Sequence, residues 1–389
     1  MKILDNKKDC VGCGLCVNIC PNNCIGMECE NDGFWYPKID TRICISCGKC
    51  KRTCPVNKPK IQIQPNGCYA LKDNDKTSRK KSSSGAASAV FYQQIIRQGG
   101  AFCGVKLNNE LHAVHDLTCC MEDIDLYRDS KYVQSNMCEA WDKIADCLEH
   151  GQKVLVTGTP CQIAAVHSRF SDTDNLILVD FICSGVPDPS LFELYKKDLE
   201  DRKGQPLKKF YFRDKTNGWK ESNIRVVYTD ETEDIITRDN SDYFQLFGNN
   251  LFFRECCYEC RFKAFNTYAD LTIGDYWGIE KLYPELDDDS GCSVVIVNTQ
   301  KGKQFFETST KNCVIKSTPL EFAIETHPKL IHSISKNPYR NQFYNIYKKG
   351  NTKLYHKAIK RCIGTSMFNK VMRKLLLKIK KQKGKRNLK

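Results

Sequence analysis

Apolar positions predict an α/β core in the middle of the chain. KVLVTGTPCQIAAVHSRF at 153–170 begins with a continuous apolar run, breaks at Gly-Thr-Pro and continues with helical spacing, and LILVDFICSGVP at 176–187 begins with a second apolar run. A strand, a helix and a strand of these lengths predict a right-handed βαβ unit with parallel strands. Further strands are expected at 101–107 and 111–117, joined as a hairpin, and within 268–278.

Helical periodicity marks three further segments. In KSSSGAASAVFYQQIIRQGG at 81–100, serines are expected to cap a helix that ends at a glycine pair. The exposed N–H groups from Ser82 to Gly85 could hold a phosphate, although an ordinary N-cap explains the same residues. The amphipathic segments at 191–204 and 341–349 are expected to be helices that cover the sheet.

The C-terminal end has its own pattern. Apolar residues recur there at steps of three and four, opposite mainly basic ones: Phe368, Val371, Met372, Leu375, Leu376 and Ile379. One interpretation is a basic amphipathic helix on an anionic membrane surface. The other, of equal weight, is a docking helix followed by a solvated tail after Lys381.

Cysteines carry the most specific signal. CVGCGLCVNICP at 10–21 and CISCGKCKRTCP at 44–55 repeat the C-x2-C-x2-C-x3-C-P run of bacterial ferredoxins, in which three cysteines hold one cube and the fourth reaches the other. Zinc also binds C-x2-C pairs, but four cysteines and a proline, written twice, favour iron–sulfur. We therefore expect two [4Fe-4S] clusters, with ligands Cys10, Cys13, Cys16, Cys20, Cys44, Cys47, Cys50 and Cys54. Cys24 and Cys29 lie outside this pattern and are expected to be small half-buried residues.

Charge and cysteine usage narrow the setting. The N-terminal MKILDNKKDC has no apolar signal region, and we expect no bilayer span, so 24 cysteines indicate a reducing compartment: a cytoplasmic protein, or one peripheral at the inner membrane face. The formal net charge is +14, but residues 348–389 hold sixteen Lys or Arg and no Asp or Glu. The remainder has a net charge of −2, which argues against nucleic acid as a partner.

A second group of cysteines is expected to meet in the folded chain. Cys161 and Cys183 follow the carboxyl ends of the two predicted neighbouring strands, where α/β sheets place ligands. Cys257 and Cys260 form a C-x2-C pair that would complete four ligands, and the adjacent Cys256 could replace Cys257. Our hypothesis is a third [4Fe-4S] cluster, and structural zinc is the alternative.

One further segment could contact a cofactor. Asp275 in YADLTIGDYWG at 268–278 could bond a ribose or ring group, and Trp277 could stack on a ring or simply be buried at the turn. Three histidines, His112, His115 and His167, are the nearest candidates for a general acid, although each is better explained as structural.

Together these motifs resemble the coenzyme F-420 hydrogenase/dehydrogenase beta-subunit family. The resemblance extends over roughly residues 68–315 and rests on GTPCQ at 158–162, CSGVP at 183–187, CCYECRF at 256–262 and ADLTIGDYWG at 269–278, with SSSGAASA at 82–89 and SKYVQS at 130–135. It implies FAD bound near the middle of the chain, with electrons passing between the clusters and the flavin, and with flavin contacts from Ser83, Ser84, Gly85, Lys131, Gln134 and Thr159. The sequence has no GxGxxG fingerprint, so FAD is expected from the resemblance alone.

These observations give one expected organisation. The fold class is α+β: a ferredoxin-type module at 1–57, a linker at 58–67, a mixed α/β flavin and iron–sulfur domain at 68–150 and 151–335, and a helical basic extension at 336–389. A soluble ferredoxin or a redox subunit would supply electrons, which pass through the clusters to FAD and leave as a hydride for F-420 or an organic substrate. The alternatives are an electron relay without its own substrate site and a zinc-stabilised binding protein.

Overall fold

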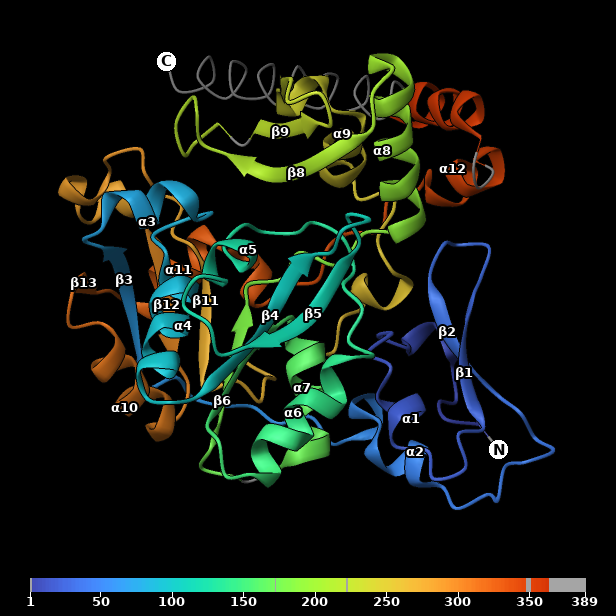
Figure 1. The fold of residues 1–389 in the computed structure, drawn as a ribbon, viewed down its shortest axis with the longest axis horizontal. Coiled ribbons are helices and arrows are strands. Elements are labelled where there is room, and N and C mark those ends of the chain that lie inside the picture. Colours follow the sequence, from blue (N-terminus) through green and yellow to red (C-terminus); the bar gives the residue numbers. More distant parts are fainter. Residues whose placement is uncertain (1, 172, 222, 348–350, 364–389) are drawn as a thin grey trace, which may run out of the picture.

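A cysteine-rich module occupies one end of the molecule (Figure 1). The computed structural model describes residues 2–171, 173–221, 223–347 and 351–363. The module is built around the antiparallel hairpin of β1 and β2, flanked by short helices. Its elements are η1 (Lys7–Asp9), α1 (Leu15–Asn18), β1 (Ile25–Cys29), β2 (Trp35–Ile39), α2 (Lys49–Thr53) and η2 (Pro55–Asn57).

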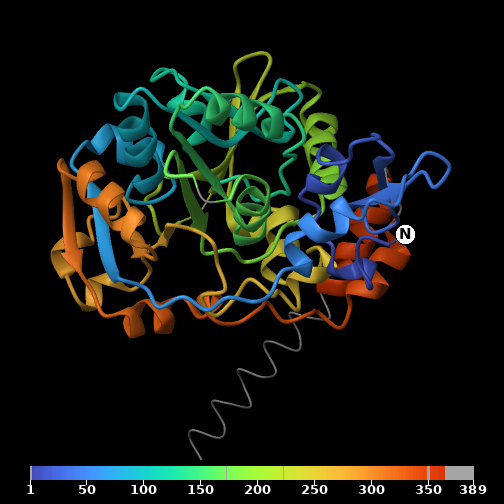
Figure 2. The ribbon, with the colours of Figure 1, turned by 90° about the horizontal axis from the view of Figure 1, so that it is seen from below.

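An extended segment joins this module to the rest of the chain. Residues 58–66 carry no helix or strand and run along the molecule to the distant strand β3 (Gly67–Asp73), as Figure 2 shows. The segment is fixed by hydrogen bonds from its backbone: Ile61 N donates to Asn266 Oδ1 at 2.9 Å, and Lys58 O accepts from Arg261 Nη2 at 2.6 Å.

An eight-stranded mixed sheet forms the centre, in the order β13-β3-β12-β11-β7-β6-β4-β5. Strands β4, β6, β7 and β11 are parallel neighbours, and β3 has the same direction because β12 lies antiparallel to both β3 and β11. Five carboxyl ends therefore share one edge. The other strands are β4 (Ala101–Leu107), β5 (Ala113–Thr118), β6 (Val154–Gly158), β7 (Leu176–Phe181), β11 (Leu271–Asp275), β12 (Ser293–Val297) and β13 (Cys313–Ser317).

Helices cover both faces of this sheet. One face packs under α4 (Ala87–Arg97), α5 (Ile124–Tyr127) and α10 (Gln300–Ser309). The other packs under α6 (Ala140–Glu149), α7 (Pro160–Phe170) and α11 (Leu320–Thr326), and Leu15 of the module joins this core beside Trp141. Short helical turns complete the cover: α3 (Lys76–Lys81), η5 (Ile279–Lys281), η6 (Pro284–Leu286) and η7 (Pro328–Leu330). The mixed α/β fold with a ferredoxin-like N-terminal part is thus confirmed.

A second, three-stranded sheet lies above the carboxyl edge of the first (Figure 1). Its core is rich in aromatic residues, and Phe192 of α8 packs against Phe210 and Phe212 of β8. The expectation that helices at 191–204 and 341–349 cover the main sheet is wrong, because their apolar faces belong to this separate core. Its elements are α8 (Pro189–Lys203), β8 (Leu207–Asp214), β9 (Asn223–Tyr228), β10 (Glu233–Ile236), η3 (Arg238–Asn240), α9 (Asp242–Gly248) and α12 (Arg340–Ile346).

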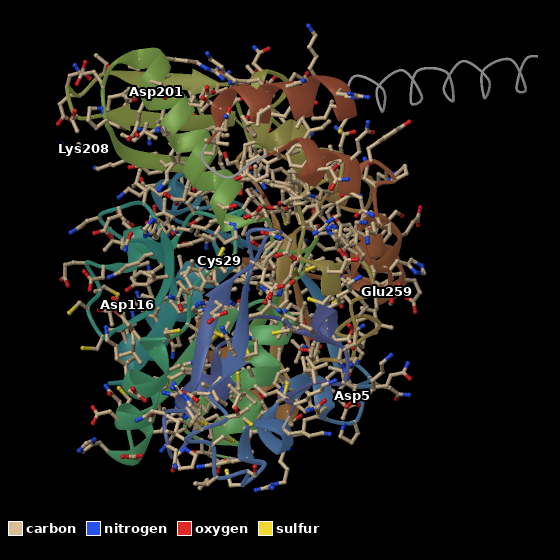
Figure 3. The ribbon with its side chains drawn as sticks, turned by 90° about the vertical axis from the view of Figure 1, so that its right-hand side faces the viewer. Asp5, Cys29, Asp116, Asp201, Lys208 and Glu259 are labelled. Atoms are coloured by element: carbon tan, nitrogen blue, oxygen red, sulfur yellow. The ribbon has the colours of Figure 1, made fainter. Side chains whose placement is uncertain are left out.

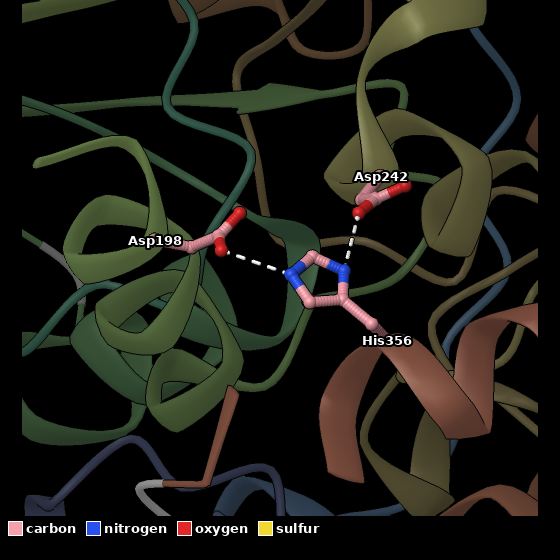
Figure 4. A group of neighbouring side chains, drawn as sticks. All are labelled: Asp198, Asp242 and His356. Carbon is pink, nitrogen blue, oxygen red and sulfur yellow. Dashed lines mark hydrogen bonds and ion pairs between the residues drawn. The ribbon is translucent and has the colours of Figure 1, made fainter. Parts of the chain in front are cut away.

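His356 connects the last described helix, residues 352–363, to the elements of this second core. His356 Nε2 lies 2.9 Å from Asp198 Oδ1 on α8, and its Nδ1 lies 3.2 Å from Asp242 Oδ2 on α9 (Figure 4). Arg202 also pairs with Asp198. The helix is therefore held by the two contacts of His356 as well as by its buried apolar face.

Two helices differ from, or lie beyond, what the sequence led us to expect. The helix within 81–100 begins at Ala87, and its N-cap is Ala86 in the left-handed conformation (φ 74°), so the expected serine cap is wrong. The basic amphipathic helix expected at 368–379 lies outside the described residues. None of the helices in the described ranges combines the length and apolar composition that a membrane span needs.

Candidate metal and cofactor sites

The eight ferredoxin-type cysteines line two small cavities in the module. One cavity is lined by Cys10, Cys13, Cys16 and Cys54, and the other by Cys20, Cys44, Cys47 and Cys50. Each set therefore takes three cysteines from one run and the fourth from the other, which is the exchange that the motif predicts. Cys24 also lines the second cavity, with its Sγ 3.3 Å from Cys20 Sγ.

Glycines at equivalent places turn the chain around each cavity. Gly14 and Gly48 are the N-caps of α1 and α2, and both have left-handed backbones (φ 74° and 71°). A side chain would be strained in this conformation, which glycine adopts readily. The turn lets the third cysteine of each run, Cys16 or Cys50, enter a helix while facing the same cavity as the first two.

Four more cysteines meet at a third cavity, of about 230 Å³. Cys161 stands in the first turn of α7, directly after β6, and Cys183 follows β7. Cys257 ends η4 (Glu255–Cys257), and Cys260 follows it. The structure therefore brings together the residues that the sequence placed on three separate segments, and Cys256 lines the same cavity.

Backbone N–H groups point at two of these sulfurs. Gly185 N donates to Cys183 Sγ at 3.3 Å, and Val186 N donates to Cys257 Sγ at 3.5 Å. Burial and the neighbouring thiols raise the pKa of Cys161, and burial raises that of Cys183 to about 12. Such thiols become thiolates when a metal cation is bound, because the cation balances charges that are otherwise unfavourable at close range.

The three cysteine cavities and a fourth, larger one lie in series. The two cavities of the module are neighbours, because one apolar cluster contains cysteines of both, namely Cys16, Cys20, Cys44, Cys50 and Cys54. Val11 lines both the cavity of Cys10 and the cavity of Cys161. Residues 183–186 separate the cavity of Cys161 from the large cavity, because they line both. A continuous row of sites therefore extends from the module into the main domain.

The large cavity, of about 470 Å³, lies at the carboxyl edge of the main sheet beneath β8. Pockets of this size at such an edge are typical of cofactor and ligand sites. Of the residues expected to contact flavin, five line it: Ser83, Ser84, Lys131, Thr159 and Asp275. Burial lowers the pKa of Lys131 to about 8, although the nearby Asp129 carboxylate opposes this shift.

Two expected flavin contacts are placed elsewhere. Gly85 packs against backbone, since a Cβ there would come within 2.2 Å of Leu71 O, and its N donates to Ser293 Oγ at 3.0 Å. Gln134 faces the module, where its Nε2 donates to Val11 O at 3.1 Å. Neither is among the described residues that line the large cavity.

Arg213 of β8 is a cavity residue that the sequence did not reveal. Its buried guanidinium donates to Asp275 Oδ2 at 2.8 Å and to Tyr132 Oη at 3.0 Å. It lies 5.6 Å from the ring centre of Trp277, which stacks on Trp219 at 4.3 Å. Asp275 is therefore already paired in the protein, and Arg213 brings a fixed positive charge to the cavity wall.

A buried polar chain supports the beginning of α7. His115 Nε2 donates to Thr157 O at 3.1 Å, and its Nδ1 accepts from Ser135 Oγ at 3.1 Å. Ser135 Oγ accepts from Gln162 Nε2, and Gln162 Oε1 accepts from Thr159 N. Burial lowers the pKa of His115 to about 4, so the neutral imidazole supports the loop as a structural residue.

The other two candidates for a general acid, His112 and His167, are not among the described residues that line the large cavity. His112 is exposed, 3.4 Å from Glu193 Oε2. The ring of His167 lies 4.4 Å from that of Tyr268.

Arg254 joins the module to the main domain. Its side chain is fully buried, and it donates to Cys10 O at 2.6 Å, to Trp35 O at 2.9 Å and to Gln134 Oε1 at 3.1 Å. The three acceptors are uncharged, and the guanidinium also lies 4.4 Å from the centre of the Tyr36 ring. A buried cation thus lies beside Cys10 of the module and directly before η4, which carries Cys256 and Cys257.

Comparison with known proteins finds matches for two parts of the chain. Residues 9–58 match a 4Fe-4S dicluster domain, and residues 151–322 match the C-terminal region of the coenzyme F420 hydrogenase/dehydrogenase beta subunit. A chain of the F420-reducing [NiFe] hydrogenase complex from Methanosarcina barkeri, solved as a xenon derivative, is similar at 18% identity with a TM-score of 0.46, over 72% of this chain and 99% of that one. No curated protein matches. The chain therefore combines a segment similar to a 4Fe-4S dicluster domain with a segment similar to the C-terminal region of the coenzyme F420 hydrogenase/dehydrogenase beta subunit.

Proposed function

We propose that the chain is an iron–sulfur flavoprotein oxidoreductase. It takes up electrons one at a time at the module of residues 1–57 and delivers two of them with a proton, as a hydride, from the large cavity. The acceptor is a small molecule, either coenzyme F-420 or an organic substrate. The observation that carries this proposal is the row of four adjoining cavities, three of them lined by cysteines.

The third cysteine cavity is proposed to hold a [4Fe-4S] cluster on Cys161, Cys183, Cys257 and Cys260. Zinc would hold four sulfurs at about 2.3 Å, and so about 3.8 Å from one another. Within the described ranges no three cysteine sulfurs lie within 4.8 Å of one another, at this site or in the module. Cysteine sulfurs that do not gather in such a tight group suit a cube, whose thiolates bind different irons, better than a single zinc ion.

The large cavity is proposed to hold FAD. When bound, FAD converts two single electrons and a proton into a hydride equivalent. Ser83, Lys131 and Thr159 line the wall from three separate segments and offer hydroxyl and ammonium donors to the cofactor. Arg213 supplies a positive charge that is fixed by Asp275, which suits an anionic group on the cofactor.

The test is anaerobic reduction, in which the absorption of the iron–sulfur clusters and that of the flavin are recorded separately. Stepwise addition of a one-electron donor should reduce the iron–sulfur absorption and bleach the flavin absorption in wild-type protein. In Cys161→Ser the module should still be reduced, while flavin reduction slows by at least tenfold. A protein that binds its clusters but no flavin would overturn the proposal and leave an electron relay without its own substrate site.

A further inference from the structure

One of the module's cavities is covered by exposed apolar side chains. Ile45 lines the cavity of Cys44 and Cys47 and is 62% exposed, which is the largest exposed fraction among the large apolar side chains of the described residues. Ile43 is 51% exposed, and Cys47 itself is exposed. Apolar side chains left in water beside a redox site indicate a contact surface.

Basic side chains surround these apolar residues. Residues 41–60 contain six Lys or Arg and no Asp or Glu. Five of them are exposed, namely Arg42, Lys49, Lys51, Arg52 and Lys60, and the first four lie within or beside the second cysteine run. Arg52 Nη1 donates to Cys47 O at 2.9 Å, which places its guanidinium beside a cluster cysteine.

Acidic groups near this surface offset only part of the charge. Asp40 pairs with Arg42 at 2.7 Å, and Asp5 lies 3.9 Å from Lys51. Within the described ranges neither Lys49 nor Arg52 forms an ion pair, so both charges can face an incoming partner. We call the residues Arg42, Ile43, Ile45, Cys47, Lys49, Lys51 and Arg52 the Cys47 surface.

We propose that the Cys47 surface docks an acidic one-electron carrier protein, such as a ferredoxin with an anionic face. The inference rests on the proposed function and deepens it, because it names where the electron donor binds and the charge of its surface. In the transfer the carrier loses one electron and the cluster site of Cys20, Cys44, Cys47 and Cys50 gains one, and no bond forms or breaks. Complementary charge raises the rate of encounter, and the isoleucines exclude water at the contact.

The proximity of a cluster cysteine favours a redox protein over an anionic membrane as the occupant. Binding to a lipid surface does not require an exposed Cys47, whereas electron transfer requires the donor to approach the cluster. The experiment must therefore distinguish docking of a redox protein from binding to a membrane.

The test is a charge reversal with a matched control. Lys49→Glu with Lys51→Glu changes the Cys47 surface, and Lys208→Glu with Lys209→Glu makes the same change of net charge on β8, where Lys208 is exposed. Figure 3 shows Lys208 far from Asp5, which marks the Cys47 surface. The second-order rate of electron transfer from a reduced acidic ferredoxin is measured by stopped flow over a range of ionic strength.

At low salt the Lys49/Lys51 variant should react at least tenfold more slowly than wild type, and the two rates should converge at high salt. The control should stay within about twofold of wild type at each ionic strength. Iron content and the end point of reduction by excess dithionite should be unchanged in both, which separates docking from loss of a cluster or of the proposed function.

Three outcomes would overturn the inference: an unchanged rate in the Lys49/Lys51 variant, an equal loss in the control, or loss of binding to anionic phosphatidylglycerol vesicles with the ferredoxin rate intact. The last would assign the Cys47 surface to a membrane.

Discussion

Arg254 Nε donates a 2.6 Å hydrogen bond to the backbone oxygen of Cys10, the first cysteine of the ferredoxin-type module. The same guanidinium reaches Trp35 O and Gln134 Oε1, so one side chain fixes the module against the domain that carries the third cysteine cavity. The rate of electron transfer depends on the distance between the redox sites, and this contact fixes the position of the module relative to that domain.

Replacing Arg254 by Gln should loosen the module. The change leaves the carbonyls of Cys10 and Trp35 without their donor, at a cost of about 2–4 kcal/mol, since bonds to charged groups contribute about 1.5–3 kcal/mol each but are not additive. The urea midpoint of unfolding should fall, and electron transfer from the module to the proposed flavin should slow by tenfold or more. Arg97→Gln, at an exposed position on α4, is the control and should match wild type. Unaltered transfer in Arg254→Gln would contradict this role.

Cys257, rather than Cys256, should be the cluster ligand. Val186 N donates to Cys257 Sγ, and Cys257 Cβ lies beside Gly185, in the wall shared with the large cavity. Cys257→Ser should therefore lose about four of about twelve irons, while Cys256→Ser retains them. Iron and sulfide analysis on anaerobically purified variants decides between the two. The reverse pattern would move the ligand to Cys256.

Lys131 should contribute to flavin affinity. Lys131→Met removes the ammonium from the wall of the large cavity and should raise the Kd for FAD about tenfold, equivalent to about 1.4 kcal/mol. Iron content should not change. Equilibrium titration of flavin-stripped protein measures the effect, and Lys208→Met on the surface of β8 serves as the control. Equal affinities in the two variants would argue against FAD at this wall.

His115 should make stability depend on pH. Its pKa in the folded protein is about 4, below its ordinary value of 6.5, so the unfolded chain binds the proton more tightly. The contribution is fully present above about pH 6.5 and is lost progressively as the pH falls toward 4.

Urea unfolding between pH 7.5 and 5.5 measures this effect in a range that spares acid-labile clusters. His115→Gln should show a flatter dependence than wild type, whereas the exposed His150→Gln should not. Identical slopes for wild type and His115→Gln would contradict the assignment.

Local patterns anticipated the elements that hold the cysteines. Buried strands β6 and β7 have continuous apolar runs, and the capping box of Thr159 and Gln162 begins α7 directly after β6. Because both strands are parallel, Cys161 and Cys183 had to emerge at the same edge of the sheet. The expectation for these two residues needed no knowledge of distant contacts.

The sequence did not predict the second sheet, because its strands lack a clear local strand pattern. The segment of β8, LKKFYFRD, alternates imperfectly and bulges against β9, so it does not show a clean period of two. Arg213 therefore seemed an ordinary basic residue, and only tertiary packing brings it to Asp275. Gln134 lies away from the large cavity for a related reason: it follows a cavity residue, Val133, but its side chain turns toward the module.

The most direct test of the central claim is the cofactor content of the whole protein. Iron, sulfide and flavin should be quantified together after anaerobic purification. We expect about twelve irons, about twelve sulfides and about one FAD per chain, for three cubes and one flavin. About eight irons without flavin would contradict it, because the cavity of Cys161 and the large cavity would then hold neither group.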